Sequence, residues 1–207
     1  WLVNPIELTT ILYVVQRMTG LASFFILSGL ISYIYGRQRQ LTGQHGMSFV
    51  LAGILGGTLL GILSKESGAL LVPFAFLIEL VFFRFRRQDQ KLDKRLIILL
   101  VLLPVLAVIY MLLHRYSPER ILASYTRRDF TLEERLMTEP RVLWLYLRLI
   151  LIPDNRLLGI WHDDIPISES LFFPPSTSPA IAGIIFLFIG GVALIRKAPL
   201  LAFGILW

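Results

Sequence analysis

The sequence has no cysteine and few charged residues. Asp, Glu, Lys and Arg make up 16% of its 207 residues, whereas soluble domains carry about 25%. The lack of cysteine excludes a disulfide framework, a thiolate nucleophile and a cysteine-based zinc site. The G-x-S-x-G, Walker and G-x-G-x-x-G motifs of common soluble enzymes are missing as well. No cofactor is therefore predicted, and a divalent metal is left open without support, since no histidine spacing typical of a metal site is present.

What the sequence does contain is long apolar runs. Hydrophobic residues make up 56% of the chain, and five runs have 16 to 18 residues each. They are Met18–Tyr35, Met47–Leu63, Gly68–Phe83, Leu96–Leu113 and Ser178–Ile195, and a sixth begins at Pro199 and is truncated. Backbone groups in lipid must be satisfied within their own segment, so such runs indicate helices. The prediction is an all-α, polytopic transmembrane helix bundle with about five full spans.

The distribution of basic residues predicts the orientation of these spans. The links after the first, third and fifth spans are basic, and the net charge is +6. By the positive-inside rule these links face the cytoplasm, so the charge is not taken as a sign of nucleic-acid binding. Three segments then face outward: an N-terminal helix at 1–17, the turn Ser64–Ser67, and a large loop at 114–177. We expect residues 1–207 to form a single transmembrane domain.

The large outer loop carries helix signals of its own. Thr131 followed by Glu134 is a capping box, which predicts a helix running to Thr138. Pro140 is expected to interrupt it, and a second helix is expected over Arg141–Ile152. That segment has only about 12 apolar residues, too few to cross a bilayer, so we expect it to lie in the interface or to re-enter.

Three groups of cationic residues fall on the predicted outer side. Arg17 stands where the first span begins, Lys65 and Glu66 lie in a turn between two spans, and Arg141 and Arg148 share a helix face with Trp144 and Leu145. Cations at membrane depth suit the phosphate of a lipid-linked ligand. Arginine and tryptophan also serve as plain interfacial anchors, and the sequence leaves this alternative open.

Two acidic groups complete the set of candidates. Asp163 and Asp164 follow Trp161 and His162, and such a carboxylate pair can act as a general base, a metal ligand or an acceptor for sugar hydroxyls. A simple turn is the alternative, because aspartate favours turns. Glu79 lies inside the third span near its cytoplasmic end, where we expect a helix-packing or interfacial role.

Several stretches together resemble a known family. Asn4-Pro5-Ile6-Glu7 with Gln16-Arg17, the turn Leu63-Ser64-Lys65-Glu66, and Trp144-Leu145-Tyr146-Leu147-Arg148 with Leu151-Ile152-Pro153 keep the motif order of the transmembrane and tetratricopeptide-repeat glycosyltransferases. That family belongs to the GT-C superfamily of polyprenyl-phosphate-sugar-dependent enzymes. The resemblance implies a GT-C-like bundle in a bacterial inner membrane with a periplasmic active face. It also implies an enzyme that moves a sugar from a polyprenyl phosphate to a protein Ser or Thr.

The resemblance assigns roles to residues as follows. Arg17, Lys65, Arg141 and Arg148 are expected to bind the donor phosphate, and Gln16, Glu66 and Tyr146 to support them. Trp161, His162, Asp163 and Asp164 are expected to contact the sugar or the acceptor.

The chain also departs from the family pattern. Asn4 replaces the usual histidine, and no early outer loop with a catalytic acid is present, so that acid is expected upstream of Trp1 and the chain is expected to be an internal fragment. Two alternatives stay open. One is an enzyme resembling O-antigen ligases or polymerases, which handle glycans on polyprenyl pyrophosphate, and the other is a non-catalytic polytopic membrane protein.

Overall fold

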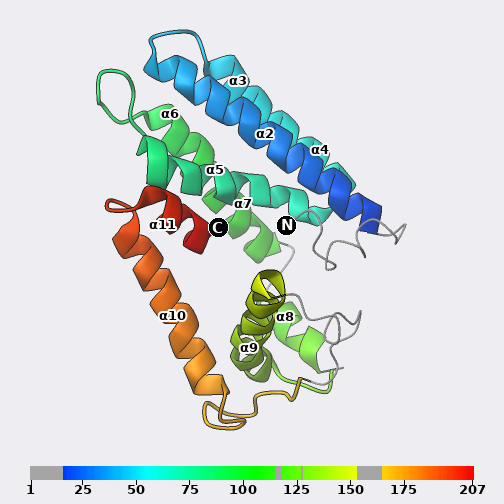
Figure 1. Ribbon diagram of the computed structural model, residues 1–207. Coiled ribbons are helices and arrows are strands. Elements are labelled where there is room, and N and C mark those ends of the chain that lie inside the picture. Colours follow the sequence, from blue (N-terminus) through cyan, green and yellow to red (C-terminus); the bar gives the residue numbers. More distant parts are fainter. Residues whose placement is uncertain (1–15, 115–117, 127, 153–164) are drawn as a thin grey trace. The chain divides into compact units, whose positions relative to one another are not determined.

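The computed structural model describes residues 16–114, 118–126, 128–152 and 165–207 (Figure 1). Within these ranges the chain is helical, and its one strand-like feature is a single bridge between Arg86 and Leu92. Five helical segments in them are long and apolar enough to cross a membrane: Arg17–Leu41, Met47–Ser64, Glu66–Phe83, Lys94–His114 and Thr177–Leu194. Each coincides with a predicted span, so the all-α class and the five spans are confirmed. The sixth apolar run forms α11 (Pro199–Leu206).

Three of the spans combine α-helix with a short stretch of different pitch. The first and last spans are single helices, α2 (Arg17–Leu41) and α10 (Thr177–Leu194). The second span consists of α3 (Met47–Leu51), a π-helical turn (Ala52–Gly56) and α4 (Gly57–Ser64). The third consists of a 3₁₀ turn (Glu66–Leu70), α5 (Leu71–Ile78) and a π-helical turn (Glu79–Phe83). The fourth consists of α6 (Lys94–Ile97), a π-helical turn (Ile98–Leu102) and α7 (Leu103–His114). The 3₁₀ turn stands at a helix start, where such turns are common, whereas π-helical turns are rare.

The chain divides into two compact units. The bundle unit comprises residues 16–109 together with Gly191–Trp207, and the loop unit comprises Tyr110–Gly190. The bundle unit therefore holds the first three spans and α11, while the loop unit holds α8 (Pro118–Tyr125), α9 (Leu132–Leu151) and most of α10.

Glycine lets the helices of the bundle unit approach closely. Helix α2 runs alongside α3 and α4 (Figure 1). A Cβ atom at Gly29 would lie 2.7 Å from the carbonyl oxygen of Gly53, and one at Gly61 would lie 3.0 Å from the Cα of Gly68. A larger side chain at these positions would push the helices apart. The buried apolar core beside them consists of Ile26, Leu30, Tyr33, Val50, Ile54, Leu71, Ala75, Ile78, Leu96, Leu99 and Leu100.

The predicted capping box opens α9 in the loop unit. The backbone N–H of Glu134 donates to Thr131 Oγ1 at 3.2 Å, and the backbone N–H of Thr131 donates to Glu134 Oε2 at 2.7 Å. Two backbone donors that the helix itself cannot satisfy are thus paired reciprocally, and this prediction is confirmed.

The predicted break at Pro140 is wrong. Helix α9 continues through this residue as one segment, so no separate helix begins at Arg141. Proline removes one backbone donor, but a neighbouring segment braces the helix on both sides of it. Ser168 N–H donates to Thr138 Oγ1 at 2.9 Å, and Arg141 Nη1 donates to the Pro166 carbonyl at 2.6 Å. These tertiary contacts offset the local cost of an interior proline.

Candidate functional site

The turn that carries Lys65 is joined to the start of α2. Lys65 has an extended backbone, with φ −161° and ψ 149°, which ends α4 and begins the next helical turn. Its ammonium Nζ donates to Thr19 Oγ1 at 2.7 Å, and that hydroxyl donates to Gln16 Oε1 at 3.1 Å. The structure thus brings Lys65 to the first turn of the helix that Arg17 begins. We call residues 16–19 and 64–68 the Lys65 end of the bundle unit.

The Lys65 end has an excess of positive charge. Lys65 is half-buried, while Arg17 and Glu66 are exposed. Among the described residues neither cation has a salt-bridge partner, and the side chain that holds Lys65 is the neutral Thr19, not Glu66. An ammonium has three donors, so two remain after the bond to Thr19. A fixed cation with free donors at the end of a membrane span can bind a phosphate as a point charge.

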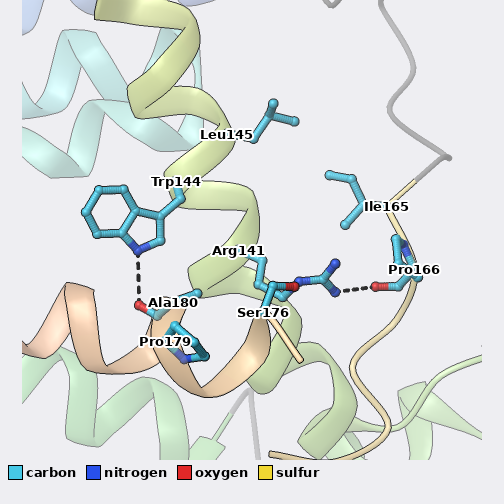
Figure 2. A pocket seen from close by; sticks show the side chains of 8 residues that line it. All are labelled: Arg141, Trp144, Leu145, Ile165, Pro166, Ser176, Pro179 and Ala180. Carbon is cyan, nitrogen blue, oxygen red and sulfur yellow. Dashed lines mark hydrogen bonds between the residues drawn. The ribbon is translucent and has the colours of Figure 1, made fainter. Parts of the chain in front are cut away.

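A second candidate site lies in the loop unit, between α9 and the start of α10 (Figure 2). It is an open cavity of about 530 Å³ lined by Arg141, Trp144, Leu145, Ile165, Pro166, Ser176, Pro179 and Ala180. Figure 2 shows the indole of Trp144 donating to the Ala180 carbonyl, at 3.0 Å. A Cβ at Gly183 would come within 2.7 Å of the indole ring, so glycine there lets the ring approach α10 closely.

The guanidinium of Arg141 has both a structural bond and spare donors. Its Nη1 donates to the carbonyl oxygen of Pro166 at 2.6 Å and to Ser168 Oγ at 3.3 Å. Arginine has five N–H donors, so the remaining ones can serve an anion at the cavity edge. The rest of the lining is largely apolar and includes an aromatic ring, which suits the ring of a sugar or an apolar group next to that anion.

The other predicted residues form two groups, one on α9 and one outside the described residues. Arg148 and Tyr146 are exposed on α9 and do not line this cavity. Arg148 is seven residues from Arg141, or about 10 Å along the helix axis. Trp161, His162, Asp163 and Asp164, and the N-terminal helix expected at 1–17 up to residue 15, lie outside the described residues.

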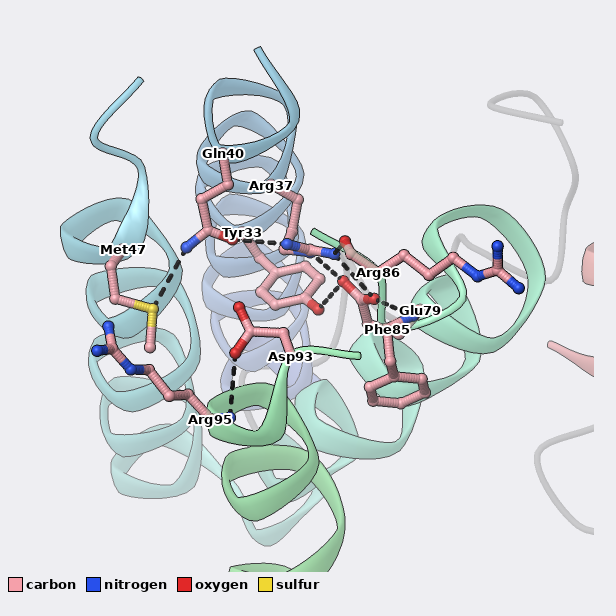
Figure 3. Close-up of polar contacts among 9 residues, drawn as sticks. All are labelled: Tyr33, Arg37, Gln40, Met47, Glu79, Phe85, Arg86, Asp93 and Arg95. Atoms are coloured by element: carbon pink, nitrogen blue, oxygen red, sulfur yellow. Dashed lines mark hydrogen bonds and ion pairs between the residues drawn. The ribbon is translucent and has the colours of Figure 1, made fainter. Parts of the chain in front are cut away.

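The bundle unit contains a buried ion pair that was not predicted from the sequence (Figure 3). Arg37 and Glu79 have no solvent exposure and form a salt bridge through Arg37 Nε and Glu79 Oε1. Tyr33 Oη donates to the same carboxylate at 2.5 Å, and Arg37 Nη1 donates to Gln40 Oε1 at 2.6 Å. The Arg37 guanidinium also lies 5.3 Å from the ring centre of Phe83. The packing role expected for Glu79 is confirmed, with Arg37 as its partner.

This ion pair also holds the loop that follows the third span. Glu79 Oε2 accepts from the backbone N–H of Phe85 at 3.0 Å, and Arg37 Nη2 donates to the Arg86 carbonyl at 2.8 Å. We call residues 36–47 and 84–95 the Arg37 end. The signal for the pair was present in the sequence, because a carboxylate inside a span requires a partner and Arg37 ends the apolar part of α2. The pair was not predicted because Arg37 was assigned to the basic link after the first span.

Asp93 is a second buried carboxylate at this end, and its partner Arg87 is half-exposed. Burial alone would raise the pKa of the Asp93 carboxyl, but three favourable contacts outweigh it and lower the pKa below its usual value. These are a 3.1 Å hydrogen bond from Arg87 Nη2, another from the backbone N–H of Arg95, and the positive charge of Arg87 and Arg37. The hydrogen bond and charge of Asp93 raise the pKa of Arg87 in turn.

Comparisons with known proteins give no family. No protein-family model, curated protein or solved structure matches the chain. Among the described residues there is also no group of three or more His, Asp or Glu side chains that could hold a metal ion. The functional conclusion therefore depends on the membrane spans and on the two candidate sites.

Proposed function

We propose that this chain is the membrane-embedded part of a glycosyltransferase that uses a lipid-linked sugar. The enzyme would move a sugar from a polyprenyl phosphate to a Ser or Thr hydroxyl of a protein acceptor. The observation that carries the proposal is the Lys65 end, where Thr19 fixes the ammonium of Lys65 beside the start of α2 without any acidic partner among the described residues.

The chemistry of the reaction needs such a cation. The acceptor oxygen attacks the anomeric carbon, the bond from that carbon to the phosphate oxygen breaks, and the hydroxyl proton passes to a base. Polyprenyl phosphate leaves with increased negative charge on its oxygens. Lys65 supplies positive charge at the span end where this phosphate would lie, and Arg17, two residues before Thr19 in α2, adds a second positive charge.

Charge distribution supports an outward-facing Lys65 end. The Arg37 end carries the exposed cations Arg84, Arg86, Arg87, Lys91, Lys94 and Arg95 against Asp89 and Asp93. By the positive-inside rule we expect that end on the cytoplasmic side of a bacterial inner membrane. The Lys65 end then lies at the periplasmic face, where a flipped lipid-linked donor and a secreted protein acceptor would meet.

The cavity beside Arg141 and Trp144 supports a second part of the proposal. Its apolar lining, indole ring and spare guanidinium donors suit a sugar ring or an acceptor segment carrying an anion. Arg141 stays a proposed ligand of the donor phosphate, and we assign the apolar lining beside Trp144 to sugar or acceptor binding, together with the predicted role of Asp163 and Asp164. Arg148 stays a proposed donor ligand, exposed two turns further along α9.

The test is transfer by the full-length protein in proteoliposomes with a labelled polyprenyl-phosphate sugar. Lys65→Ala should lower donor affinity and transfer by roughly 10- to 100-fold, because a hydrogen bond to a charged group contributes about 1.5–3 kcal/mol. Lys65→Arg should retain much of both. Lys94→Ala, which removes an exposed cation at the other end, is the control and should change neither.

Other outcomes identify the alternatives. Transfer of a glycan from polyprenyl pyrophosphate, with none from the monophosphate, would place the protein with the ligases or polymerases. Unchanged donor binding after combined replacement of Arg17, Lys65 and Arg148 would show that these cations are interfacial anchors, and the non-catalytic alternative would then be the better one.

A further inference from the structure

The loop between the third and fourth spans contains two kinds of cation. Arg87 forms a 3.1 Å ion pair with Asp93, and Lys91 lies 3.8 Å from Asp89. Arg84 and Arg86 are different. Within the described ranges neither has an acidic partner, and the guanidinium of Arg86 donates to a neutral group, Gln90 Oε1, at 3.1 Å. Two guanidinium charges in one short segment are thus left without a counter-charge.

The backbone that carries these two arginines is held by the buried ion pair. Arg84 has a left-handed backbone with φ +56°, which ends the span directly after Phe83. The backbone of the next two residues is hydrogen-bonded to the buried ion pair, since Phe85 N–H donates to Glu79 and the Arg86 carbonyl accepts from Arg37. Asp93 N–H also donates to the Phe85 carbonyl at 2.7 Å. Arg84 and Arg86 therefore extend from a fixed backbone, which lowers the entropy lost when they bind a ligand.

Both arginines line a cavity of about 350 Å³ in the bundle unit. Its polar part consists of Arg84, Arg86 and Gln90, and its apolar part of Leu41, Val81, Phe82, Phe83 and Pro199. Three of these contributors stand at helix ends: Leu41 closes α2, Phe83 closes the third span, and Pro199 opens α11. The cavity thus lies where spans meet the loops, with an apolar and a cationic side.

We propose that this cavity binds one anionic phospholipid by its headgroup. The guanidinium groups of Arg84 and Arg86 would pair with the phosphate, and Gln90 would bond a headgroup hydroxyl. The apolar side would receive the glycerol and the first acyl carbons, which a free phosphate ion lacks. The position at the span ends matches the depth of a phospholipid phosphate, and basic residues at this level attract anionic lipid. This site is separate from the Lys65 end and does not depend on the proposed transferase activity.

The experiment is native mass spectrometry of the full-length protein in detergent with added phosphatidylglycerol or phosphatidylcholine. We expect one phosphatidylglycerol to be retained in preference to phosphatidylcholine. The double variant Arg84→Gln/Arg86→Gln should weaken that binding by roughly 10- to 30-fold, since each basic residue near a lipid surface contributes about fivefold to the affinity. Leu41→Trp, which keeps every charge but fills the apolar side, should weaken it as well.

A matched control separates the cavity from the general charge of the loop. Lys94→Gln/Arg95→Gln removes the same two charges from the same end of the unit but leaves this cavity intact. It should retain the bound lipid. An equal loss in both double variants would overturn the proposal in favour of diffuse attraction. Displacement of the lipid by inorganic phosphate at equal concentration would overturn it too, by showing a simple anion site. Circular dichroism of each variant separates lost binding from lost folding.

Discussion

The two ends of the bundle unit differ in whether their cations are paired with an acid. At the Arg37 end, Arg37 and Glu79 are completely buried and paired, and Tyr33, Gln40 and the loop backbone occupy their remaining donors and acceptors. At the Lys65 end a half-buried ammonium is held by a neutral hydroxyl, with no ion pair in the described part of the chain. A buried charge must be neutralised within the fold, whereas a charge at the boundary can be left for a ligand.

This difference separates structural charges from candidate binding charges. The pair is completely buried, and all three guanidinium nitrogens of Arg37 are hydrogen-bonded within the fold, so we assign Arg37 and Glu79 to folding and to the shape of the 84–93 loop. Within the ranges that the structure describes, Lys65 bonds only to Thr19 and keeps two donors, and Arg84 and Arg86 resemble it in lacking an acidic partner. Stability should therefore depend strongly on the first group and weakly on the second.

The largest effect is expected from Glu79→Leu. This change leaves the Arg37 guanidinium buried without its counter-charge, and breaking a buried pair in this way costs about 3–5 kcal/mol. Thermal unfolding in detergent should show the loss. The double variant Arg37→Met/Glu79→Leu removes both charges and should recover much of the stability. A double variant as unstable as the single one would mean that the bonds to the loop backbone, rather than the pairing of charges, dominate.

Much of this fold was open to prediction from sequence, and the Arg37–Glu79 pair shows why the rest was not. The five spans follow from hydropathy alone, because lipid imposes a helix on any long apolar run. The capping box at Thr131 is equally local, as all its atoms lie within four residues. The pairing of Arg37 with Glu79 depends on which helices are neighbours, and the continuity of α9 through Pro140 depends on bonds to residues 166 and 168. Neither relation has a local signature.

The candidate sites show the same limit. That Lys65 and Glu66 lie in a turn between spans could be predicted from their spacing. That Thr19 holds Lys65 could not, because the two residues are separated by 45 others and come together only through the contact of α2 with α4. The resemblance gave Glu66 a supporting role next to Lys65, whereas the hydrogen-bond partner of Lys65 among the described residues is Thr19.

The second-largest effect should come from Tyr33→Phe. The change removes one hydrogen bond to the Glu79 carboxylate while the charge pair stays intact. Hydrogen bonds to charged groups contribute about 1.5–3 kcal/mol, so we expect a loss of about 2 kcal/mol in the free energy of unfolding. Phe83→Leu, which removes the ring beside Arg37 and no hydrogen bond, is a comparison and should cost less. A negligible effect of Tyr33→Phe would show that the network tolerates an unfilled acceptor.

A smaller, pH-dependent effect is expected at the partly exposed pair of the same end. The pKa of the Asp93 carboxyl is lower in the folded protein than in the unfolded chain. Its contribution to stability is therefore complete above the unfolded value of about 3.9 and is lost as the pH falls through that value toward the folded pKa. Because Arg87 is half-exposed, the total should be about 1 kcal/mol or less. Asp93→Asn should flatten the acid limb of the unfolding curve between about pH 5 and 3, and an unchanged limb would contradict the assignment.

The smallest effect on stability should come from Lys65→Gln, and this result would complete the contrast between the two ends. Glutamine can still donate to Thr19 Oγ1, and no acid among the described residues depends on the ammonium, so the free energy of unfolding should change by about 0.5 kcal/mol or less. Donor binding should nevertheless fall, because the amide carries no charge for a phosphate. A loss of stability comparable to that of Glu79→Leu would mean that Lys65 is a structural charge like Arg37. The proposed phosphate site would then lose its main support, since a cation that is paired within the fold is not available to a ligand.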